Sequence, residues 1–185
     1  LCIQDTSKDN LCNHKNRLNP GEGLGSSDNS TNATCFKIHP ALVLDANSLY
    51  PLGFSAVKVF ERNEHRPDRF ERNYKRQPIE DKESYKWIEV SAASKTTLSQ
   101  ASQITFIQDR EGDIYEQFAL IVDDKHHLLI RSRTTRNLSA GSDLYSEMKR
   151  LPVAGVYTIC IATDRRINRD KRTAQIAVRY GSFLI

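Results

Sequence analysis

The segments Leu1-Cys-Ile-Gln-Asp5 and Ile104-Thr-Phe-Ile-Gln-Asp109 are short apolar runs that close on the same three residues, Ile-Gln-Asp. Each run has the length and apolar content of a buried strand, and each ends in an acid. If the two strands are parallel neighbours, their carboxylates meet at one edge of the sheet. In open α/β sheets that edge is where ligand and catalytic sites lie. This pair of segments therefore decides both the expected fold and the expected site.

The segments between these runs predict further strands and helices. Two apolar runs, 36–46 and 53–61, flank a turn and predict an antiparallel hairpin. A helix is expected over 81–99 with Asp81 as its N-cap, and a second helix is expected after Asp113, which would cap it. A strand over 128–133 follows. This order predicts an α/β fold with a mixed sheet and flanking helices.

The last part of the chain has a different character and predicts a second domain. Residues 143–151 predict a short helix, and residues 156–163 and 173–180 predict two strands joined by a strongly basic tip. We therefore expect a first domain over 1–133 and a β-rich second one over 134–185. Both ends of the chain resemble strands and the first residue is not Met, so an excised piece of a longer protein is expected.

The composition predicts a globular chain with a modest core. Its 185 residues are 38% hydrophobic and 27% charged, which disfavours a disordered tail. No apolar run approaches the ~20 residues that span a bilayer, and no signal peptide is evident, so a cytoplasmic protein without a membrane partner is expected. The formal charge of +4 permits a nucleic-acid partner without proving one. No Cys-x-x-Cys pair occurs, so reduced thiols are expected at Cys2, Cys12, Cys35 and Cys160.

Two polar segments interrupt the apolar pattern. Residues 6–34 are rich in Asn, Ser and Gly, and they are long for a loop, so we expect a functional or a mobile segment. The stretch Gly21-Glu-Gly-Leu-Gly25 within it has neither the strand before it nor the helix after it that a phosphate loop needs. Residues 62–77 are highly charged. They are either a solvated surface or a first basic patch that could contact DNA.

The two strand-end acids, Asp5 and Asp109, are the residues best suited to metal chemistry. Two carboxylates held close repel each other unless a cation lies between them, and Mg²⁺ (or Mn²⁺) prefers such oxygen ligands. Two ions roughly 3.5–4 Å apart can clamp the attacking and leaving oxygens of a phosphodiester. The alternative is structural, because an acid after a strand is often a turn residue or a helix N-cap. Glu111 and Asp113 are weaker candidates, and no histidine has the spacing of a metal ligand.

Five segments of the chain resemble the DDE cut-and-paste transposases of insertion sequences, the kanamycin-transposon transposase-like family. Ile3-Gln-Asp-Thr-Ser7 resembles their first catalytic motif, and Asp109-Arg-Glu-Gly-Asp-Ile114 resembles their second. Residues 39–46 resemble the family's second strand, and Ile130-Arg-Ser132 resembles the strand that follows the second motif. Lys82-Glu-Ser-Tyr-Lys-Trp87 resembles the family's Lys-Glu-Ser-x-Lys-Trp segment. The segments come in the family's order and at similar spacing, and they extend over most of the chain.

The resemblance implies a ribonuclease H-like catalytic core whose three metal ligands are Asp, Asp and Glu. Asp5 matches the first ligand and Asp109 the second. The third lies in the family's Tyr-x-x-Arg-x-x-x-Glu-x-x-x-x-x-x-Lys signature, which this sequence does not contain. By this resemblance, residues 1–133 are an incomplete catalytic core and 134–185 are the start of a β-rich insertion. We therefore expect this piece to be inactive alone.

The resemblance also implies what the parent protein does. It would be a bacterial, nucleoid-associated homodimer that binds double-stranded DNA at transposon inverted repeats and at the target. Two Mg²⁺ or Mn²⁺ ions would support strand cleavage and strand transfer. Basic residues beside the site and at the hairpin tip are expected to contact phosphates. These are Arg131, Arg133, Arg165, Arg166, Arg169 and Arg172.

Two other classes of function stay open at this point. The chain could be a DNA-binding module without catalysis, such as the remnant of a decayed element. It could also belong to a different two-metal nuclease of the same fold, such as a Holliday-junction resolvase. A downstream helix with a glutamate, in a gene flanked by inverted repeats, would distinguish a transposase from both.

Overall fold

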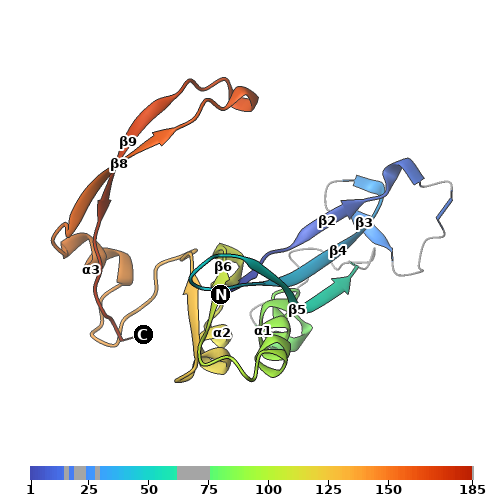
Figure 1. Ribbon diagram of the computed structural model, residues 1–185, viewed down its shortest axis with the longest axis horizontal. Coiled ribbons are helices and arrows are strands. Elements are labelled where there is room, and N and C mark those ends of the chain that lie inside the picture. Colours follow the sequence, from blue (N-terminus) through green and yellow to red (C-terminus); the bar gives the residue numbers. More distant parts are fainter. Residues whose placement is uncertain (15–16, 19–23, 28–29, 62–75, 185) are drawn as a thin grey trace. The chain divides into compact units, whose positions relative to one another are not determined.

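The computed structural model describes residues 1–14, 17–18, 24–27, 30–61 and 76–184. The chain divides into two compact units, Leu1–Arg133 and Thr134–Ile185. The first holds a mixed sheet with two α-helices, and the second holds one α-helix and a separate two-stranded hairpin (Figure 1). The predicted mixed α/β fold is therefore confirmed.

Strand β1 (Cys2–Gln4) lies in the middle of the central sheet. On one side it pairs antiparallel with β4 (Ser30–Leu44), which pairs antiparallel with β5 (Pro51–Phe60). On the other side β1 pairs parallel with β6 (Ile104–Gln108), and β6 pairs parallel with β7 (His126–Ile130). The predicted hairpin is confirmed, and the two Ile-Gln-Asp strands are neighbours as expected; they pair parallel, which was the condition for their acids to meet at one edge.

The polar stretch 6–34 contains strands in its described part, which the sequence pattern did not predict. It contains β2 (Ser7–Asn10) and β3 (Gly25–Ser27), which both pair antiparallel with β4. All four residues of β2 are exposed. Their pairing needs only backbone N–H and C=O groups, so it leaves no alternation of apolar residues in the sequence.

The helix α1 (Tyr85–Thr97) follows a 3₁₀ turn, η2 (Ile79–Asp81). The prediction that Asp81 caps this helix was wrong, because Asp81 lies inside the 3₁₀ turn and Lys82 is extended after it. The helix N-cap is Ser84, whose side chain makes no capping hydrogen bond.

The helix α2 (Tyr115–Ile121) is preceded by a second 3₁₀ turn, η3 (Arg110–Gly112). The prediction that Asp113 caps α2 was also wrong, because the N-cap is Ile114. The carboxylate of Asp113 instead accepts a hydrogen bond from the backbone N–H of Arg133 at 2.7 Å, twenty residues away in sequence.

Helices α1 and α2 pack against the same face of the sheet (Figure 1). The apolar core of this unit combines strand residues with residues of both helices. Its buried members are Cys2, Ala41, Ile88, Val90, Ile104, Phe106 and Ile121. The cysteine thiol lies inside this core, and burial raises the pKa of Cys2. It therefore behaves as a small core residue.

The second unit contains α3 (Leu144–Arg150) and the hairpin of β8 (Gly155–Ile161) and β9 (Arg172–Val178). The predicted helix and hairpin are both confirmed. Asp143 caps α3 by accepting from the backbone N–H of Ser146, and hydrogen bonds from Ser146 and Thr135 lower the pKa of Asp143 to about 2. Among the described residues, no helix of either unit is long and apolar enough to cross a membrane.

Candidate functional site

Asp5 and Asp109 follow directly after two paired parallel strands. The register between β1 and β6 places Cys2 opposite Phe106 and Ile3 opposite Ile107. Asp5 directly follows β1 and Asp109 directly follows β6, so each acid lies two residues beyond the Ile3–Ile107 pair. Both aspartates are exposed. The structure therefore brings the two predicted site residues to the same edge of the sheet.

One oxygen of each carboxylate is held by the local backbone. Asp5 Oδ1 accepts from the N–H of Thr6 at 2.7 Å, and Asp109 Oδ1 accepts from the N–H of Glu111 at 2.7 Å. Asp109 is the N-cap of η3, so the structural role weighed for it from the sequence is present as well. Among the described residues, the hydrogen bonds to these two acids engage only Oδ1 of each. The arrangement is thus compatible with a further contact at each Oδ2.

Arg131 lies at the same sheet edge, and Arg133 follows it by two residues. Gln108 of β6 is opposite Ile130 of β7, so Arg131 comes next to Asp109 in the register. The backbone N–H of Arg131 donates to the carbonyl of Gln108 at 3.4 Å. Both arginines are exposed. The backbone of Arg131 is therefore fixed next to Asp109, whereas the N–H of Arg133 is held by Asp113 Oδ2.

A cluster of paired charges that the sequence analysis did not single out lies next to this edge. The Nζ atom of Lys86 is 3.8 Å from Glu111 Oε2 and 3.7 Å from Glu83 Oε1. Lys37 Nζ also contacts Glu83 Oε1, at 3.0 Å. Both lysine side chains are buried, and buried charges of this kind are kept only when they are paired. The i, i+3 spacing of Glu83 and Lys86 was the available signal, but Lys37 is remote in sequence.

His39 is fully buried beneath the residue that follows Asp5. Its Nδ1 lies 2.8 Å from Thr6 Oγ1, and its ring meets Trp87 edge-on with ring centroids 4.4 Å apart. Burial lowers the pKa of His39 to about 4, and the charges of Lys86 and Lys58 act in the same direction. A neutral imidazole therefore holds Thr6, and through the backbone it fixes the position of Asp5.

The free energy of unfolding should fall as the pH drops from 6.5, the ordinary pKa of histidine, to about 4, its value in the folded protein. Between these values only the unfolded chain takes up the proton of His39. The contribution of neutral His39 to the free energy of unfolding is fully present above pH 6.5, and it falls by about 3 kcal/mol between pH 6.5 and about pH 4. Urea denaturation at several pH values measures this slope. A His39→Gln variant that keeps the same slope would show that other groups cause it.

Gly112 lies where η3 passes over the side chain of Gln108. A Cβ atom added at position 112 would collide with Gln108 Oε1 and would lie 2.9 Å from Gln108 Cβ. Gly112→Ala should therefore destabilise the protein by about 1–3 kcal/mol in urea denaturation. Gly155→Ala is the matched control, because a Cβ atom there meets nothing within 4 Å. Equal effects of the two changes would contradict the close approach at Gly112.

The predicted basic tip lies in the second unit, between β8 and β9. Its four arginines are all exposed: Arg165, Arg166, Arg169 and Arg172. Arg166 forms a bidentate ion pair with Asp164, in which Nε lies 3.2 Å from Oδ1 and Nη2 lies 3.2 Å from Oδ2. Of the other predicted basic segment, 62–77, residues 62–75 lie outside the described part of the chain.

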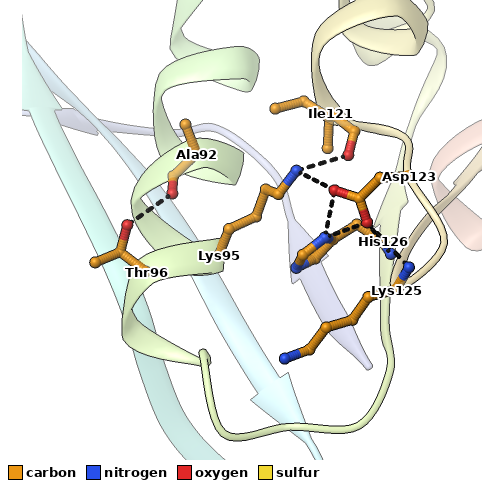
Figure 2. Close-up of polar contacts among 7 residues, drawn as sticks. All are labelled: Ala92, Lys95, Thr96, Ile121, Asp123, Lys125 and His126. Atoms are coloured by element: carbon orange, nitrogen blue, oxygen red, sulfur yellow. Dashed lines mark hydrogen bonds and ion pairs between the residues drawn. The ribbon is translucent and has the colours of Figure 1, made fainter.

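A second group of titratable side chains lies at the start of β7, at the other end of the strand from Arg131. Figure 2 shows that the carboxylate of Asp123 contacts His126 Nδ1 at 2.6 Å and Lys95 Nζ at 2.7 Å. The Lys95 ammonium is the largest cause of the strongly lowered pKa of Asp123. Lys95 also donates to the carbonyl of Ile121, which ends α2. The group ties α1 to the turn before β7, which is a structural role.

Across the described ranges, no group of three or more His, Cys, Asp and Glu side chains is placed to hold a metal ion. The edge therefore offers two carboxylates, which is a partial set of ligands. Comparison with protein-family models gives no match. Comparison with curated proteins gives no match either. The case for a function thus depends on the residues and geometry of this edge.

Proposed function

We propose that this chain is part of the ribonuclease H-like catalytic core of a DDE-type DNA transposase. The observation that carries the proposal is the parallel pairing of the two Ile-Gln-Asp strands, because Asp5 and Asp109 directly follow these paired strands. Two acids from segments about a hundred residues apart in sequence come to one sheet edge, and that edge is where active sites of open α/β sheets lie.

The topology of the sheet supports this assignment. A central β1 with an antiparallel β4 and β5 on one side, and parallel β6 and β7 on the other, agrees with a ribonuclease H-like arrangement. The segments that resemble the family also meet in space. Lys86 of the Lys-Glu-Ser-Tyr-Lys-Trp block contacts Glu111 of the Asp-Arg-Glu-Gly-Asp block.

The donors at the edge fit a hard divalent cation such as Mg²⁺ or Mn²⁺. Asp5 and Asp109 supply carboxylate oxygens, which these ions prefer, and both side chains are open to solvent. Mg²⁺ is commonly bound by one or two carboxylates together with substrate phosphates. When bound, the ion would neutralise charge on a phosphodiester and lower the pKa of a water nucleophile.

The remaining residues of the edge would hold and orient the nucleic acid. Arg131 and Arg133 are exposed after β7, the strand that neighbours β6, and their guanidinium groups suit phosphate oxygens. The basic tip of the second unit would add further phosphate contacts, which set affinity and position more than sequence preference. Within the parent protein, a homodimer on inverted repeats in the bacterial cytoplasm would bring two such cores to the two transposon ends.

A DNA-binding module without catalysis is the second candidate, and one observation favours it. Asp109 already has a structural task as the N-cap of η3, and no third acidic ligand joins the pair among the described residues. In that case the basic residues would act alone, and neither aspartate would influence DNA binding through a cation.

A gel-shift and nicking experiment separates the two candidates. If the chain is a transposase core, it should bind DNA more tightly in Mn²⁺ than in EDTA, because DNA phosphates complete the coordination of an ion held by Asp5 and Asp109. Asp109→Asn should remove this gain while keeping an N-cap acceptor. The same samples should not nick supercoiled plasmid, because the two-ion clamp needs more ligands than this pair. DNA binding that is indifferent to Mn²⁺ would favour the non-catalytic module.

A further inference from the structure

The glutamines of the two Ile-Gln-Asp segments meet beneath the candidate site. Gln4 and Gln108 are buried, and Gln108 Nε2 donates to Gln4 Oε1 at 2.9 Å across the β1–β6 pair. Each glutamine directly precedes one of the two aspartates. The hydrogen bond therefore links the two strands at the last residue before the site.

Ser91 of α1 is the point where the buried amides converge. Its Oγ lies 3.0 Å from the Nε2 of Gln4, 3.3 Å from that of Gln108 and 3.0 Å from that of Gln117 on α2. These four residues, Gln4, Ser91, Gln108 and Gln117, are here named the amide cluster. The cluster joins β1, β6, α1 and α2, which are the elements that support the site edge.

The cluster is not what stability alone would favour at this position. Gln108 Oε1 and Gln117 Oε1 are buried and make no hydrogen bond among the described residues. A buried polar network with unsatisfied members is less stable than a well-packed apolar core. What the network adds is geometric specificity, because directional hydrogen bonds fix one axial position of β1 against β6.

The cluster also supports the turn that contains Asp109. The side chain of Gln108 lies directly under η3, so close that Gly112 has no room for a Cβ atom. Asp109 caps that same turn through the N–H of Glu111. A displacement of the Gln108 amide would therefore move the turn and, with it, the carboxylate of Asp109.

We propose that the amide cluster positions the carboxylates of Asp5 and Asp109 for a shared divalent cation. The proposal rests on the function proposed above. Its residues do not touch the cation. They set the spacing of the two ligands through β1, β6 and η3, in the way that partners behind metal ligands commonly do.

Two variants of the whole chain test the proposal with Mn²⁺ titration calorimetry. Gln108→Met removes the links to Gln4 and Ser91 with little change in volume, and Ser91→Ala removes the convergence point with the smallest change in packing. Each should weaken Mn²⁺ binding by about tenfold to a hundredfold. The matched control is Ser55→Ala, which breaks a partly buried Ser55–Ser94 hydrogen bond of 2.8 Å between β5 and α1. It should leave Mn²⁺ binding unchanged.

A second readout is independent of the metal. In the metal-free protein, ¹⁵N relaxation dispersion should show new exchange at the amides of Asp5 and Asp109 in the Gln108 and Ser91 variants, and none in Ser55→Ala. Folded variants that bind Mn²⁺ like the parent and show no such exchange would overturn the proposal. If the parent does not bind Mn²⁺ through Asp109, the proposed function fails. The dispersion result then decides separately whether the cluster orders the two acids.

Discussion

Replacing the four arginines of the hairpin tip by alanine should flatten the salt dependence of DNA binding. They are Arg165, Arg166, Arg169 and Arg172, and all are exposed. Each arginine that neutralises a phosphate contributes about 0.9 to the slope of log K against log salt, because it releases condensed counterions. Four contacts therefore contribute about 3.6, which is roughly a hundredfold loss of affinity for a fourfold rise in salt.

The ion pair between Arg166 and Asp164 makes the contributions unequal. Arg166 must exchange a carboxylate for a phosphate, so its single replacement should change the slope least. A gel-shift series over rising salt measures the slope for each variant. Lys149→Ala with Arg150→Ala is the control, since both side chains are exposed on α3 of the same unit. A slope that is equal in the tip variant and the control would show that the tip is only a solvated turn.

The strands β1, β4, β5 and β6 could be predicted from the sequence because each has a local apolar pattern. The two Ile-Gln-Asp runs and the hairpin of β4 and β5 have apolar content over five or more residues, and turn residues separate them. Parallel pairing of β1 with β6 was the condition under which the two strand-end acids would meet at one sheet edge, and the structure has this pairing. The apolar patterns needed no knowledge of distant contacts.

The helix caps could not be predicted, because tertiary contacts decide them. Asp113 precedes a helix as an N-cap should, but its carboxylate is engaged by the N–H of Arg133 from the end of the next strand. Asp81 is likewise placed in a 3₁₀ turn before the helix. The N–H groups at a helix start compete with other donors for the carboxylate of a candidate N-cap residue. A donor from elsewhere in the chain can bind that carboxylate instead.

The buried polar groups around the site were missed for the same reason. Lys37 and Glu83 are 46 residues apart, and Gln4 and Gln108 are 104 residues apart, so no window of sequence contains either pair. The repeated glutamine of Ile-Gln-Asp was visible as a pattern. Its meaning, a hydrogen bond between the two strands, required the register of β1 on β6.

In the function proposed above, Asp5 and Asp109 act together as ligands of one divalent cation. The main alternative is that Asp109 serves only as the N-cap of η3. The chain offers a matched control for this distinction. Asp164 caps the 3₁₀ turn η4 (Arg165–Ile167) through the N–H of Arg166, just as Asp109 caps η3 through the N–H of Glu111. At both positions asparagine keeps the capping acceptor and removes the charge. Asp109→Asn and Asp164→Asn therefore differ only in the surroundings of the residue that is changed.

The most direct measurement is therefore Mn²⁺ binding by the parent chain and by Asp5→Asn, Asp109→Asn and Asp164→Asn, followed by electron paramagnetic resonance of free Mn²⁺. The parent should bind weakly, because two carboxylates are a poor cage for such an ion without substrate phosphates. Asp5→Asn and Asp109→Asn should each weaken binding by at least about tenfold, and Asp164→Asn should leave it unchanged. Mn²⁺ binding that is equal in all four proteins would contradict a shared ion at this edge.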